Sequence, residues 1–131
     1  MKKFITLCIC SLSIFWGCED NFFNSSCFDD KPETGGLTIR VSIEQFDTVP
    51  VKIYQGYYEN NNLLFEDTLY EGTKHWDMPV NSRYTVAAEY KKEGKFYFVI
   101  DGGEIKTRYN EDTYTDPCWE LSELDLNLKL K

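Results

Sequence analysis

The only histidine of the chain, His75, is the first residue to consider for catalysis, and it lies beside Trp76 and Asp77. Nucleophilic catalysis requires a nucleophile and a base within hydrogen-bond reach, with a third group that orients the base. Sequence adjacency does not supply that geometry. We therefore interpret His75 as a surface residue and predict no catalytic site.

Acidic residues occur in clusters that raise the question of a metal site. They are Asp29–Asp30, Glu66–Asp67, Glu111–Asp112 and Asp116. Calcium takes about six to eight oxygen ligands, and the loop 109–116 could supply several. The Asp-x-Asp-x-Asp-Gly spacing is absent, however, and a glycosidase-like pair of carboxylates can be drawn from any acidic surface. Solvated acidic loops are the favoured interpretation, so we predict no metal and no cofactor.

The first 17 residues have the layout of an export signal. Lys2 and Lys3 precede an apolar stretch from Phe4 to Trp16 that contains no acidic residue. This stretch is shorter than the roughly 20 residues that span a bilayer core. We therefore predict that residues 1–17 form a signal peptide, which is excluded from the fold.

The signal ends at Gly17-Cys18, and Glu19-Asp20 follow at once. This sequence resembles the lipobox of bacterial lipoproteins, and the acidic residues resemble those of lipoproteins of the Bacteroidota. The resemblance covers residues 1–20. It implies that Cys18 is lipidated and holds the protein in the cell outer membrane, surface-exposed or periplasmic, since two or three acyl chains make a stable anchor. The alternative is an ordinary cleaved signal and a secreted product.

Two cysteines, Cys27 and Cys118, remain once the signal is removed and Cys18 is lipidated. Exported domains of this size commonly use a disulfide to supplement a modest core. A metal pair and two free thiols are the alternatives, although two cysteines and one distant histidine make a poor tetrahedral zinc site. We predict a Cys27–Cys118 disulfide, with Phe28 and Trp119 packed beside it.

Exposed aromatic residues are the remaining candidates for ligand binding. Tyrosine and tryptophan give a large contact area with a polar handle, which suits sugar rings and protein partners. Packing across strands is the alternative. A net charge of −10 over residues 18–131 argues against nucleic acid as a partner. The candidates at strand ends and loops are Tyr57, Tyr58, Tyr109, Tyr114 and Trp119.

The segments that would position these residues are predicted to be β-strands. Apolar and polar residues alternate with a period of two, and no convincing helical period is present. The strand-like segments are 37–43, 49–58, 63–70, 83–91, 96–100, 104–109 and 124–130. The turn signals between them include Asn60–Asn62, Lys92–Gly94 and Asp101–Gly103. In the last strand, Leu126 and Leu128 should be buried. In the strand 96–100, Phe96, Phe98 and Ile100 form an apolar stripe on one face.

Short strands at this spacing predict an all-β fold, a single seven- to eight-stranded antiparallel β-sandwich. The predicted domains are a tether over 18–36 and the sandwich over 37–131. The stretch Trp76–Val86 resembles carboxypeptidase-regulatory-like, transthyretin-like sandwiches, with Asn81-Ser82 in place of the usual glycine, and Val49–Tyr54 resembles their second strand. This resemblance implies a transthyretin-like or Ig-like architecture and no chemistry.

Transthyretin-like hydroxyisourate hydrolases share this fold class but need more than one histidine and end in Tyr-Arg-Gly-Ser, unlike Asn127–Lys131 here. We therefore expect a non-enzymatic lipoprotein, attached to the outer membrane by its lipid, whose sandwich binds a protein or a glycan. The alternative is a structural accessory subunit or anchor of a cell-surface fibre or transport assembly.

Overall fold

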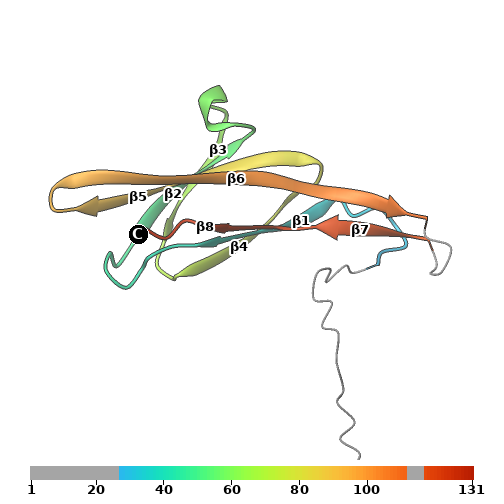
Figure 1. The fold of residues 1–131 in the computed structure, drawn as a ribbon, viewed down its shortest axis with the longest axis horizontal. Helices are drawn as coiled ribbons and strands as arrows, with labels where there is room; N and C mark the ends of the chain where they lie inside the picture. The colour runs from blue at the N-terminus through green and yellow to red at the C-terminus, as the bar shows by residue number, and fades with distance from the viewer. Residues whose placement is uncertain (1–26, 112–116) are drawn as a thin grey trace, which may run out of the picture.

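The computed structural model describes residues 27–111 and 117–131, and these form two β-sheets packed face to face (Figure 1). The elements are β1 (Thr34–Arg40), β2 (Val49–Gln55), the short 3-10 helix η1 (Tyr58–Asn60), β3 (Leu63–Leu69), β4 (Thr73–Pro79), β5 (Ser82–Lys92), β6 (Lys95–Asn110), β7 (Cys118–Ser122) and β8 (Leu124–Asn127). One sheet has the order β4-β1-β8 and the other β3-β2-β5-β6-β7. The predicted all-β sandwich is confirmed.

The core lies between the two sheets and is built from every second residue of the central strands. Leu37 and Ile39 of β1 are fully buried against Val51 and Ile53 of β2 and the inner face of β5. At the end of the chain, Leu126 and Leu128 are 2% and 0% exposed, whereas their polar neighbours are exposed. The predicted burial of these two leucines is confirmed.

A buried tyrosine joins the two layers. Tyr90 of β5 is 1% exposed, and its hydroxyl donates to the backbone carbonyl of Leu128 while accepting from the backbone N–H of Ser42. Both partners follow strands of the other sheet. A buried hydroxyl without partners would be costly, so this side chain fixes the relative placement of the layers.

One pairing departs from the predicted antiparallel arrangement, because β1 and β8 are parallel. The strand before β8, β7, belongs to the other sheet, and the chain crosses between sheets at Glu123. This crossing brings β8 alongside β1 in the same direction.

The prediction of a turn at Asp101–Gly103 is wrong, since β6 runs straight through these residues. Neither glycine has a positive φ. They are needed for close packing instead: a Cβ atom at Gly102 would lie 2.7 Å from the carbonyl oxygen of Tyr84, and one at Gly103 would lie 2.5 Å from Cδ1 of Leu124.

Two other local predictions, the loop at Lys92–Gly94 and the left-handed conformation of Asn81, are confirmed. Glu93 and Gly94 form the loop between β5 and β6 with φ of 53° and 76°. Asn81 takes the left-handed region, with φ of 58°, and its amide side chain is held by Thr107. Further along β5, Tyr84 is 1% exposed and donates from its hydroxyl to the carbonyl of Pro79 at 2.6 Å. Burial raises the pKa of this phenol.

The N-terminal boundary of the sandwich lies earlier in the chain than predicted. β1 begins at Thr34, inside the segment predicted as a tether. Before it, Phe28 forms an isolated antiparallel bridge with Trp119 of β7. The described chain is therefore attached to the five-stranded sheet from its first residues.

Candidate binding surfaces

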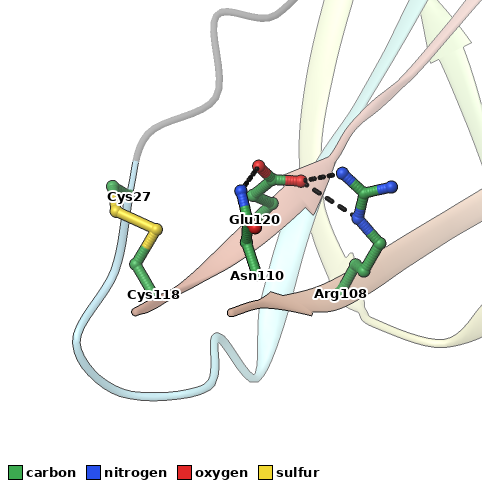
Figure 2. Close-up of a disulfide and its surroundings, with 5 residues drawn as sticks. All are labelled: Cys27, Arg108, Asn110, Cys118 and Glu120. Atoms are coloured by element: carbon green, nitrogen blue, oxygen red, sulfur yellow. Dashed lines mark hydrogen bonds and ion pairs between the residues drawn. A yellow bond between two sulfur atoms is a disulfide. The ribbon is translucent and has the colours of Figure 1, made fainter. Parts of the chain in front are cut away.

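The predicted disulfide is present at the end of the molecule where the described chain begins (Figure 2). Cys27 and Cys118 are bonded, and their Cα atoms lie 5.4 Å apart. Next to them, Phe28 and Trp119 exchange two backbone hydrogen bonds of 3.0 and 2.8 Å. The bridge thus joins the entry of the chain to the start of β7.

A charged cluster lies beside this disulfide on β6 and β7 (Figure 2). Arg108 donates from Nη2 and Nε to one carboxylate oxygen of Glu120, at 2.7 and 3.2 Å, and Asn110 donates to the other at 2.9 Å. The hydrogen bond from Arg108, followed by that from Asn110, holds the pKa of Glu120 below its usual value. Because Arg108 and Glu120 are directly opposite in the ladder, the cluster holds β7 on β6, which is a structural role.

Tyr109 and Trp119, two of the predicted binding aromatics, are near this end. They face each other across β6 and β7 with ring centroids 5.2 Å apart, and the Lys31 ammonium lies 5.6 Å from the Trp119 ring. Cross-strand packing of this kind stabilises a sheet. The Tyr109 ring remains exposed, so the pair could also contact a ligand.

Tyr57 and Tyr58 belong to a second cluster, at the connection between β2 and β3. The Arg83 guanidinium lies 4.2 Å above the Tyr57 ring, and Tyr58 packs edge-on against Tyr54 at 5.2 Å. β3 and β7 are opposite edges of the five-stranded sheet, so the predicted aromatics form two separate clusters and not one platform. The fifth candidate, Tyr114, lies outside the described residues.

A row of exposed apolar side chains lies on β6, on a face whose orientation was not predicted from the sequence. Phe96, Phe98 and Ile100, here called the β6 stripe, are 57%, 59% and 42% exposed. The reason is the register of the hairpin. The buried residues of β5 include Ala88 and Tyr90, which are opposite Val99 and Tyr97. Residues directly opposite share a face, so Val99 and Tyr97 lie on the same face as the core, although Tyr97, near the end of the hairpin, is 41% exposed.

The β6 stripe lies on the outer face of the five-stranded sheet. Its three residues are opposite Lys91, Glu89 and Ala87 of β5. Periodicity showed two alternating faces on this strand but not their orientation. The signal that finds the orientation is the neighbouring strand: once the tight loop at Glu93–Gly94 sets the register, the inward face of β5 determines that of β6.

His75 has partners that were not predicted. Its Nδ1 lies 3.1 Å from the Thr38 hydroxyl, and its Nε2 lies 3.5 Å from a carboxylate oxygen of Asp77. A hydroxyl, an imidazole and a carboxylate are the components of a nucleophilic triad. However, the His75 and Asp77 side chains are 53% and 75% exposed. Electrostatic stabilisation of a transition state needs a water-excluded site, and this open sheet face does not offer one.

Three further features bear on binding. An open depression of about 440 Å³ lies over β2 and β3, where Lys52 and Glu66 form a 3.7 Å ion pair, and its lining is mainly polar. Among residues 27–111 and 117–131, no group of three histidine, cysteine or acidic side chains is placed to hold a metal ion. No helix in the described part of the chain is long and apolar enough to cross a membrane.

Comparison of the chain with protein-family models, with curated proteins and with solved structures finds no significant match.

Proposed function

We propose that this protein is a lipid-anchored, non-enzymatic module that binds a protein partner through the outer face of its five-stranded sheet. The observation that carries the proposal is the β6 stripe. Three large apolar side chains lie in a row on a regular strand, and each is at least 42% exposed. Exposed apolar rows with charged neighbours are characteristic of protein-interaction sites.

A protein partner fits this surface better than a glycan. Sugar rings need hydrogen-bonding groups beside an aromatic face, and phenylalanine and isoleucine have none. The neighbouring charges of Lys91 and Glu89 would form a polar rim around the stripe.

Export is supported by the disulfide, because such bonds persist in oxidising compartments and are rare in the cytosol. If Cys18 carries the lipid, nine residue steps separate it from Cys27, which span at most about 30 Å. The Cys27 end of the sandwich would then lie close to the membrane. The hairpin of β5 and β6 is at the opposite end of the molecule (Figure 1), so the β6 stripe would be directed away from the membrane.

The anchor is tested by Cys18→Ala. We expect this variant to lose acyl labelling and to leave the membrane fraction or keep its signal peptide. Normal lipid incorporation in the variant would show that the lipobox assignment is wrong.

Partner binding is tested by site-specific photocrosslinking in intact cells of the native host. A photoreactive residue in place of Phe98 should give a covalent adduct with a different protein, identified by mass spectrometry. The matched control is position Leu63, which is 43% exposed and lies on β3 at the other side of the sheet. Equal adducts at both positions, or none at Phe98, would contradict the proposal, as would binding to a glycan array that is lost in Phe98→Ser.

A further inference from the structure

β6 has a free edge, which is a backbone feature separate from its outward face. β6 pairs with β5 from Lys95 to Ile105. On its other side it pairs with β7 only from Lys106 to Asn110. Along residues 95–105, no other strand of the described chain pairs with that side. Backbone groups there are available to another strand.

This edge lacks the usual protection against pairing. Natural edge strands are blunted by proline, by charged residues, by bulges or by being short. Here five consecutive residues, Phe96 to Ile100, are uncharged and apolar or aromatic, and the register with β5 is continuous, without a bulge. The only charges are at the ends of this segment, Lys95 on one side and Asp101 on the other.

The tight hairpin indicates which residues offer their backbone. Only Glu93 and Gly94 separate the paired residues Lys92 and Lys95, so that pair closes the loop with hydrogen bonds. Hydrogen-bonded and non-hydrogen-bonded pairs then alternate along the ladder. It follows that Phe96, Phe98 and Ile100 direct their N–H and C=O groups to the free side.

We propose that two copies of this protein pair through β6 in antiparallel orientation, about a twofold axis at Phe98. In this register each Phe96 is opposite the Ile100 of the second copy, and the backbone groups of both are available. Each Lys95 is opposite the Asp101 of the second copy, so the charges at the two ends are complementary. The two five-stranded sheets join into one continuous sheet, and the two β6 stripes lie side by side on its outer face.

Neighbouring registers are less favourable. A shift of two residues in one direction places Asp101 opposite Glu93, and like charges directly opposite are destabilising. A shift of two residues in the other direction moves the loop of the second copy toward Lys106, where β7 already occupies the edge. A twofold axis at Phe98 avoids both the pair of like charges and the overlap with β7.

The register is tested with single cysteines in the full chain, exported and purified without reductant. Opposite residues of a hydrogen-bonded antiparallel pair have Cα atoms about 5.5 Å apart, which a disulfide can span. We therefore expect Phe98→Cys to form a disulfide-linked dimer on a non-reducing gel. Phe96→Cys alone should not, because two such positions are about 14 Å apart along the strands, whereas a mixture of Phe96→Cys and Ile100→Cys should crosslink.

Charge exchange tests the same pairing without added cysteines. In sedimentation, the unmodified protein should dimerise, and Asp101→Lys should shift it toward monomer. The double variant Lys95→Asp with Asp101→Lys should restore the dimer. Both side chains are exposed, so folding is not at risk, and far-UV circular dichroism checks this.

A monomeric native protein, or equal crosslinking of Phe98→Cys and Phe96→Cys, would overturn the inference. The proposed function is distinguishable from it. If position 98 crosslinks to a different protein while the isolated chain stays monomeric, the partner-binding proposal stands and the self-pairing does not.

Discussion

Removal of the Cys27–Cys118 disulfide should cost this protein a large part of its stability. In the double variant Cys27→Ala with Cys118→Ala, the folded state loses only the packing of the buried Cys118 sulfur, because Cys27 is exposed and the Phe28–Trp119 bridge remains able to form. The unfolded chain, in contrast, is freed from a cross-link between residues 91 positions apart. The chain-entropy relation gives about 4–5 kcal/mol for a loop of this length, which corresponds to a fall of roughly 15–20 °C in Tm.

Urea unfolding followed by tryptophan fluorescence measures this effect. The double variant should unfold at lower urea with a larger m-value, because an unfolded chain without the cross-link exposes more surface. The unmodified protein in strong reductant serves as the control and should match the variant. A loss of less than about 1 kcal/mol, with an unchanged m-value, would refute the view that the cross-link acts on the unfolded chain.

Three further predictions concern the core, the β6 glycines and the charged cluster. Leu128→Ala should destabilise the protein by about 2–5 kcal/mol in urea unfolding, and Asn127→Ala by no more than about 0.5 kcal/mol. Gly102→Ala should cost about 1–3 kcal/mol, because the added methyl group has no room against β5. For Glu120, the pKa is lowered in the folded state by Arg108, so its stabilising effect is complete above the unfolded pKa of about 4.5 and is lost as pH falls through the lower folded pKa. The stability difference between the unmodified protein and Glu120→Gln should therefore shrink once the pH falls below about 4.5.

Each of these has a control. Equal effects at Leu128 and Asn127 would contradict the alternation of buried and exposed residues at the end of the chain. Gly72→Ala is the control for Gly102, since its Cβ would meet only ordinary contacts, the nearest at 3.7 Å. A pH-independent difference for Glu120→Gln would show that the hydrogen bonds from Arg108 and Asn110 do not favour the ionised carboxylate.

Local rules in the sequence predicted much of the fold because they act over a few residues. Strict alternation placed Leu126 and Leu128 in the core, and the tolerance of asparagine for the left-handed region explained Asn81. The disulfide was predictable because the predicted export signal and the proposed lipid left two cysteines to pair.

The incorrect predictions have one cause in common, which is contact between residues far apart in the sequence. Asp101–Gly103 reads as a turn by composition, but the glycines are required by neighbours far away in sequence, the Tyr84 carbonyl and Leu124. The orientation of Phe98 depends on the register of β5, and the parallel β1–β8 pairing depends on the sheet to which each strand belongs. Likewise, nothing local shows that Tyr57 and Trp119 lie at opposite edges of a sheet.

The disulfide also determines how the molecule would bear mechanical force. Tension applied to the chain before Cys27 passes through the two sulfur atoms into β7, so β1 is not peeled from its sheet. From β7 the load enters β6 through their ladder and runs along that strand to the β5–β6 hairpin. A pull on the hairpin therefore loads the rungs between β6 and β7 together, in shear, instead of opening them one after another. The sandwich would therefore resist extension between the Cys27 end and the β5–β6 hairpin.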